Sequence, residues 1–182
     1  FSAVMGFRAD IGQKLASTNY ILELCLLLAI GVSSTMAAFC LSRPDAHQKP
    51  WIKIIPFAFL IPLILITVNG LDNSLGGASI SESLASNHLD CPLHIFMFTV
   101  PPALVLFLIV RMGATIQCCW AGTMATLSVT SFAYILMRLI EQTDDVTHLL
   151  IWHALPIVLM CMVGMILGQI TLKWRFTGKN KL

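Results

Sequence analysis

The sequence predicts an all-α protein, a polytopic transmembrane helical bundle that forms a single domain over residues 1–182. Of the 182 residues, 57% are hydrophobic and only 11% are charged, whereas about a quarter of the residues of a soluble domain carry charge. Five apolar stretches have about the 20 residues that a helix needs to cross a bilayer. These predicted spans cover about residues 20–41, 51–69, 91–110, 117–140 and 149–172.

The chain starts at Phe1 rather than Met, and residues 1–6 read as the end of an apolar segment that began upstream. We therefore expect that the natural N-terminus is missing. A short polar connection at 7–19 leads to the first complete span, 20–41, which carries one carboxylate, Glu23, near its start.

The second and third spans contain prolines. Two prolines are expected to bend the second span, and Pro101-Pro102 is expected to interrupt the third. Between these spans, residues 70–90 form the longest polar segment, which contains no Lys or Arg. A short surface helix is expected near residues 79–86 of this segment.

Lys and Arg residues are distributed unequally between the two ends of the spans. The loop at 42–50, the turn at 111–116, the tail at 173–182 and the interfacial Lys53 together hold eight of the 11 Lys and Arg residues. The other end holds the remaining three, Arg8, Lys14 and Arg138. The positive-inside rule then places the C-terminus in the cytoplasm.

This topology gathers thiol, imidazole and carboxylate side chains on the outward side, at the start of the third span and between the fourth and the last. The group comprises His88, Asp90, Cys91, His94, Asp144, Asp145, His148 and His153. Such side chains bind borderline and soft divalent metals, which indicates a metal-sensing or thiol-sensing site. The candidate sensing residues are Cys91, His94, His148 and His153, and the candidate metal ligands are Cys91, His88, His94 and His153.

A structural interpretation of the same residues stays open. Histidines in surface loops are solvated, and His94 and His153 can satisfy each other or a backbone carbonyl. No spacing matches a closed zinc motif. We therefore expect no resident cofactor, and at most the transient binding of a soft divalent metal.

Small residues indicate close packing between helices. Gly164 and Gly168 form a GxxxG motif in the last span, and Ala121 and Gly122 lie near the start of the fourth. Small side chains let two transmembrane helices approach closely. We expect these residues to serve packing within the bundle rather than dimerisation.

Two further pairs have competing interpretations. Cys118-Cys119 opens the fourth span, and packing is its expected role, although a helix N-terminus lowers the pKa of a thiol. Glu23 and Arg138 are ionisable groups within spans, which makes them functional candidates. Mutual pairing or contact with the interface is the simpler interpretation.

No catalytic constellation is evident in the sequence. It contains no HExxH, no phosphate-binding loop, no catalytic triad at helix spacing and no paired CxxC, so we expect that the protein is not an enzyme. A membrane oxidoreductase would need a second thiol pair. A small metal-handling transporter or channel would need polar residues through the bilayer, and the spans offer scattered Ser and Thr besides Glu23.

Short motifs follow one another in a definite order along the chain. They are Gly6-Phe-Arg-Ala-Asp10, Cys91, Arg111-Met-Gly-Ala114, Ala121-Gly122, Tyr134, Trp152-His153, Gly164, Gly168 and Leu172-Lys-Trp174. Their order and spacing resemble the NrsF-type membrane anti-sigma factors, which are negative regulators of an extracytoplasmic-function sigma factor. The resemblance covers essentially the whole chain.

The resemblance implies six transmembrane helices in the intact family member. This chain would then lack most of the first helix and the cytoplasmic segment before it, through which the family is thought to hold its sigma factor. It also implies two outward cysteines that sense oxidants or heavy metals. Cys91 matches the first, but Leu136-Met-Arg138 stands where the family has Leu-His-Cys. Sensing would then depend on Cys91, alone or with His94, His148 and His153.

The function implied by the resemblance is that of an anti-sigma factor in the bacterial inner membrane. It would sequester an extracytoplasmic-function sigma factor, mainly through the segment before Phe1, and release it on oxidative or heavy-metal stress sensed on the periplasmic side. Its partners would be that sigma factor and the lipid bilayer, without direct contact to nucleic acid. The alternative function is a small metal-handling transporter or channel.

Overall fold

The computed structural model describes residues 6–74, 90–113, 115–141, 144 and 146–172. Within these ranges the elements are helical, and five segments are long and apolar enough to cross a membrane, which confirms the predicted fold class. These are α3 (Thr18–Leu41), η2 with α4 (Pro50–Lys53 and Ile54–Ser74), α6 (Asp90–Arg111), α7 (Cys118–Ile140) and η3 with α9 (Leu149–Ala154 and Leu155–Thr171). The short helices are α2 (Ile11–Lys14), η1 (Pro44–Gln48) and α8 (Val146–His148).

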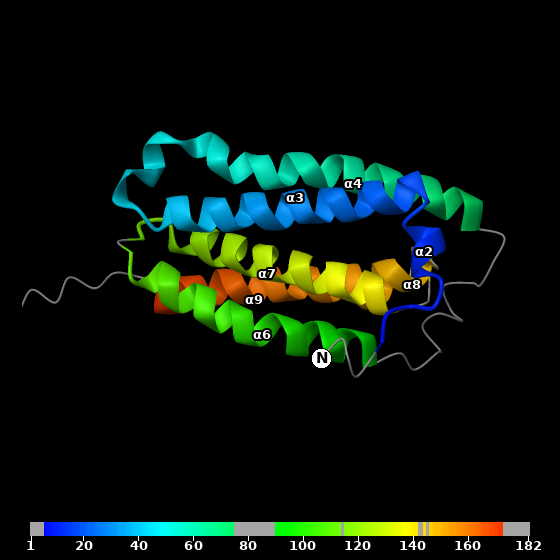
Figure 1. Ribbon diagram of the computed structural model, residues 1–182. Helices are drawn as coiled ribbons and strands as arrows, with labels where there is room; N and C mark the ends of the chain where they lie inside the picture. The colour runs from blue at the N-terminus through cyan, green and yellow to red at the C-terminus, as the bar shows by residue number, and fades with distance from the viewer. Residues whose placement is uncertain (1–5, 75–89, 114, 142–143, 145, 173–182) are drawn as a thin grey trace, which may run out of the picture.

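Helix α7 lies at the centre of the bundle. It packs against α3 on one side and against α9 and α6 on the other, while α4 packs on α3 (Figure 1). Most residues of α7 are buried, whereas few of the described residues of α4, α6 and α9 are. The apolar surface of the molecule is therefore carried by the outer helices.

Four buried hydroxyl side chains explain how the least apolar of the five spans can be the central one. Thr126, Thr130 and Ser131 donate hydrogen bonds to backbone carbonyls one turn earlier in α7, and Ser128 pairs with Thr35 of α3. A hydroxyl that is buried without a partner costs free energy. These hydrogen bonds remove that cost for polar side chains inside the bundle.

The crossing of α7 and α9 is built on glycines. A Cβ atom on Gly122 would overlap the carbonyl oxygen of Gly164, one on Gly164 would overlap the side chain of Thr126, and one on Gly168 would crowd the backbone of Gly122. Ala121 is fully buried in the apolar cluster that α7 shares with α3. The small residues identified in the sequence thus lie at contacts within a single chain.

Two local expectations were wrong. Helix α6 continues through Pro101 and Pro102 without interruption, because a proline removes one backbone hydrogen bond and a transmembrane helix tolerates this loss. Residues 70–74 belong to α4 rather than to a polar loop, since the single glycine among them lowers helix propensity by only about 1 kcal/mol. The expected surface helix at 79–86 lies outside the described residues.

Candidate functional site

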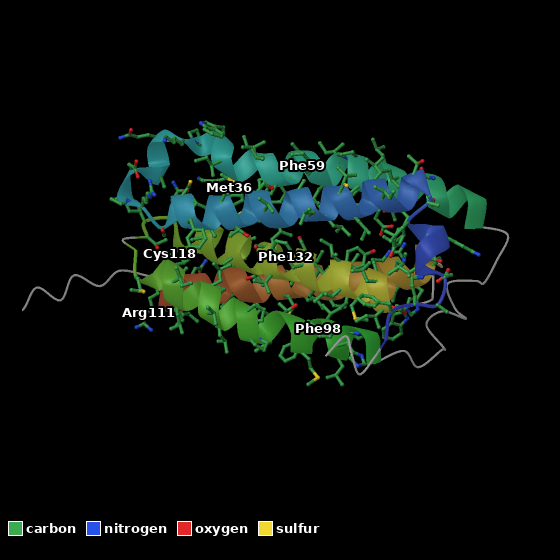
Figure 2. All side chains as sticks on the ribbon, viewed as in Figure 1. Met36, Phe59, Phe98, Arg111, Cys118 and Phe132 are labelled. Carbon is green, nitrogen blue, oxygen red and sulfur yellow. The ribbon has the colours of Figure 1, made fainter. Side chains whose placement is uncertain are left out.

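Ionisable side chains gather at one end of the bundle, where α3 begins, α7 ends, and α2 and α8 lie (Figure 1). This is the end predicted to face outward, and Arg111 and Cys118 lie at the opposite end (Figure 2). We distinguish two groups. The ion-pair cluster consists of Arg8, Asp10, Lys14, Glu23, Arg138 and Asp144. The carboxylate–histidine triad consists of Glu141, His148 and His153.

Asp144 is the centre of the ion-pair cluster. Its Oδ2 lies 2.8 Å from Arg8 Nη2 and 2.6 Å from Lys14 Nζ, and its Oδ1 lies 3.1 Å from Arg138 Nη1. All three cations of the predicted outward end are therefore held in ion pairs.

Arg8 is only 2% exposed, although it precedes the first short helix. Its guanidinium donates two hydrogen bonds to Asp10, with Nε–Oδ1 2.6 Å and Nη2–Oδ2 2.9 Å. Its backbone N–H donates to the Leu139 carbonyl over 3.1 Å. Gly6 opens this segment with φ +71°, a conformation that glycine adopts without steric cost. The polar connection expected at 7–19 is therefore fixed to the end of α7.

Arg138 of α7 pairs with Glu23 of α3, with Nη2 2.9 Å from Oε2. This confirms the pairing that the sequence suggested for these two intramembrane charges. The Arg138 guanidinium also lies 5.2 Å from the centroid of the Tyr20 ring, and the Tyr20 hydroxyl donates to the Arg138 carbonyl over 2.7 Å. A buried cation needs a paired anion and further polar contacts, and Arg138 has both.

The ion pairs shift the pKa values of the groups that lie outside the spans. A hydrogen bond from Arg8 lowers the pKa of Asp10, and hydrogen bonds to Asp10 and then Asp144 raise the pKa of Arg8 above its usual range. Burial by itself would raise the pKa of Asp144. Hydrogen bonds from Arg8, Lys14 and Arg138 outweigh burial and hold the Asp144 pKa well below its usual range. Arg8, Asp10 and Asp144 are therefore ionised at neutral pH.

In the carboxylate–histidine triad, Glu141 lies between two buried histidines. Its Oε1 is 2.8 Å from His148 Nε2, and its Oε2 is 2.8 Å from His153 Nε2. The two imidazole rings have centroids 5.5 Å apart. The three candidate ligand atoms all lie within 4.8 Å of one another. Two imidazoles and one carboxylate form a donor set suited to a divalent transition metal.

The π-helical geometry of η3 explains how the two histidines come to the same side. Residues five apart in an α-helix point about 140° away from each other, whereas a π-helix bonds residue i to residue i+5. Leu155 N–H donates to the Leu150 carbonyl in this pattern. His148 and His153 are five apart, so this turn places them together.

A cavity of about 360 Å³ lies beside the ion-pair cluster. Its lining combines charged and aromatic side chains of α3 and α7, including Tyr20, Glu23, Tyr134 and Arg138, with Thr67 of α4. The ion-pair cluster therefore borders an open cavity between α3, α4 and α7.

The predicted sensing residues lie on α8, on the adjoining η3 and on α6. His148 and His153 are together in the carboxylate–histidine triad. Cys91 lies in the first turn of α6, and His94 is half-buried further along that helix, which packs against η3. His88 and the side chain of Cys91 lie outside the described part of the chain. A sensing or metal-binding role for these residues stays a prediction.

Arg8 and Glu141 are site residues that sequence reasoning missed. The signal for Arg8 was the Gly6–Asp10 motif, in which a glycine precedes an arginine and an aspartate that are close enough to pair. Glu141 gave no comparable signal, because the spacing from Glu141 to His148 and His153 fits neither an α-helical face nor a zinc motif.

Comparison with protein families finds a match over residues 1–174 to the family described as NrsF, negative regulator of sigma F. The matched range includes both the ion-pair cluster and the carboxylate–histidine triad. No curated protein and no solved structure matches the chain.

Proposed function

The chain belongs to the NrsF family of negative regulators of sigma F, and from this premise we propose that it is an inner-membrane anti-sigma factor. It sequesters an extracytoplasmic-function sigma factor and releases it on oxidative or heavy-metal stress sensed on the periplasmic side. The single observation that carries this proposal is the family match over residues 1–174 of the 182.

The outer surface of the bundle supports a location in the membrane. Apolar side chains such as Ile61, Leu104 and Ile170 are 61–71% exposed. An apolar surface of this extent would drive association in water, whereas lipid chains cover it at no cost. Figure 2 shows side chains that project from the outer faces of α4 and α6.

The charge distribution supports the proposed orientation. The basic loop that begins after α3 and the turn after α6 share one end of the bundle, where the backbone of Gly113 closely approaches Ser42. Positive residues near the ends of spans favour the cytoplasmic side. We therefore place this end in the cytoplasm and the ion-pair cluster in the periplasm.

We place the main contact with the sigma factor in the segment before Phe1, as the resemblance to the family suggests. Co-purification of the sigma factor with this chain and with a longer form that carries the segment tests this placement. Strong binding by the 182-residue chain alone would move the contact to the loop at 42–50 or to the tail at 173–182.

Helix α7 offers a route by which the periplasmic end can affect the cytoplasmic end. Arg138 holds its outward end to α3, and Cys118 begins its opposite end. A stimulus that alters contacts at the outward end would change how α7 packs against α3 and α9. The stimulus shifts the equilibrium between two packing arrangements of α7 only if its interaction free energy differs between them.

The experiment that tests the sensing step is a reporter driven by the partner sigma factor. Cys91 opens α6, which packs against both α7 and η3, so a modified Cys91 can perturb both elements. We expect Cys91→Ser to abolish the response to cadmium or oxidant, while Cys118→Ser and Cys119→Ser, at the other end, leave it intact. If Cys91→Ser responds like the parent, the signal enters elsewhere.

A further inference from the structure

We propose that the carboxylate–histidine triad is a binding site for a borderline divalent transition metal, with Zn²⁺ as the ion that fits it best. The site retains His153 from the metal ligands expected from the sequence and adds His148 and Glu141. The proposal concerns binding by the chain itself, so it stands whether or not the chain regulates a sigma factor.

The spacing of the donor atoms matches the size of the proposed ion. A tetrahedral Zn²⁺ with bonds of about 2.0–2.1 Å holds its ligand atoms about 3.3 Å apart. In the triad, each imidazole Nε2 lies 2.8 Å from a Glu141 oxygen, and no two ligand atoms are more than 4.8 Å apart. To seat the ion, the two contacts with Glu141 would lengthen by about half an ångström, and the widest separation between ligand atoms would close toward about 3.3 Å.

The burial of the His153 ring and its lack of hydrogen bonds to the described residues provide an independent indication of a ligand. The side chain is completely buried, and among the described residues neither of its ring nitrogens has a hydrogen-bond partner. Its Nε2 is close to Glu141 Oε2 in distance, but the angles do not make a hydrogen bond. A buried polar group without a partner costs about 1–3 kcal/mol. A cation bound at Nε2 would give this buried nitrogen a partner.

The surroundings hold the two imidazoles in place. The Tyr134 ring of α7 meets the His153 ring edge-on at 5.5 Å between centroids, and the π-helical turn brings His148 to the same side. Preorganised ligands on regular elements bind a metal without first ordering a loop. The Glu141 side chain is 15% exposed, which leaves a fourth coordination position for water or an exchangeable ligand.

The donor chemistry selects the class of ion. Two neutral imidazoles and one carboxylate suit Zn²⁺ and its first-row neighbours, whereas Mg²⁺ and Ca²⁺ prefer oxygen ligands and soft ions prefer thiolates. The triad contains no sulfur ligand. It therefore differs in kind from a site built on Cys91.

Zinc binding can be measured directly on the purified full chain in detergent. Isothermal titration calorimetry with Zn²⁺ should show one ion per chain, and X-ray absorption of the zinc-loaded protein should show nitrogen and oxygen neighbours without sulfur. Absence of binding, or a sulfur neighbour of the zinc, would overturn the proposal.

Substitutions separate the metal site from a purely structural contact. His148→Gln and His153→Gln keep side chains that can hydrogen-bond to Glu141 but lose the imidazole ligand. We expect each to weaken zinc binding more than about 100-fold, since loss of an outer-shell partner alone costs 10–100-fold. The matched control, His47→Gln at the opposite end, should bind zinc like the parent.

Two further variants keep the test decisive. Circular dichroism and size-exclusion chromatography show whether each variant folds. If a histidine variant does not fold, Glu141→Gln tests the site instead, because it preserves the shape of the side chain and removes its charge. Cys91→Ser should retain zinc binding. Loss of binding in Cys91→Ser, or retained binding in folded variants of the triad, would overturn the assignment.

Discussion

Asp144 joins segments that are far apart in the chain, because it accepts hydrogen bonds from an arginine 136 residues earlier and from another on α7. Its carboxylate balances several positive charges at once, so its removal leaves those charges close together. Two of these charges are the buried guanidinium groups of Arg8 and Arg138. Asp144 is therefore expected to contribute to the stability of this end of the bundle through several contacts at once.

We predict that Asp144→Asn lowers the free energy of unfolding by about 1–3 kcal/mol. Breaking a fully buried ion pair costs about 3–5 kcal/mol, and the smaller value is expected because a third of the Asp144 side chain is exposed. Thermal unfolding in detergent measures the effect. Asp45→Asn, in the exposed turn η1, is the control and should leave the unfolding midpoint unchanged.

The lowered pKa of Asp144 also predicts how stability depends on pH. The unfolded chain takes up a proton near the ordinary aspartate pKa of about 3.9, whereas folded Asp144 does so only at lower pH. Its contribution is therefore complete above about pH 5 and is lost progressively as the pH falls below about 4.

The measurement is the unfolding midpoint of the parent and of Asp144→Asn between pH 3 and pH 7. The difference between the two proteins should shrink at the acidic end. A constant difference across this range would mean that the Asp144 charge does not stabilise the fold.

Among the helical elements, α9 approaches α7 so closely that the contact has no room for a Cβ atom at Gly122, Gly164 or Gly168. The Cβ position on Gly164 is occupied by Thr126, whose hydroxyl is itself bound to the Gly122 carbonyl. Neither the hydroxyl nor the α7 backbone can move without losing a hydrogen bond. The contact is therefore intolerant of even one added methyl group.

We predict that Gly164→Ala destabilises the bundle by about 1–3 kcal/mol, the usual cost of overpacking. In a helix without such a neighbour, the same change is stabilising by up to about 1 kcal/mol. Gly12→Ala in α2 is the matched control, because a Cβ there meets nothing within 4 Å. Equal thermal midpoints for the two variants would contradict the close α7–α9 packing.

At the scale of the whole molecule, the two ends of the bundle have different charge chemistry. The end that holds the ion-pair cluster pairs its cations with carboxylates, whereas the other end carries basic loops and, at its edge, Lys53 over the Trp120 ring at 5.5 Å. Aromatic and basic side chains of this kind are typical of a membrane interface. The fold is therefore asymmetric along its long axis.

This asymmetry predicts the topology in the membrane. Alkaline phosphatase inserted between Gly76 and Gly77 should be active, and the same enzyme fused after Leu182 should be inactive, because it folds only in the periplasm. A fusion in the loop at 42–50 should be inactive too. Activity at the tail and none at 76–77 would reverse the orientation and place the ion-pair cluster in the cytoplasm.

The sequence by itself determined the fold class and the approximate limits of the five spans. Length and apolar composition decide whether a helix can cross hydrocarbon, and both are local properties. The sequence left mutual pairing or contact with the interface open for Glu23 and Arg138, and the structure shows the pairing.

Only the tertiary structure decided which helix is central and which polar side chains form the site. Arg8 looked like part of a linker until the fold placed it against the end of α7, and that contact depends on distant residues. The joint position of His148 and His153 depends on a π-helical turn, which a period of 3.6 residues does not predict. Such arrangements follow from packing between elements that are distant in the chain, so no local sequence pattern predicts them.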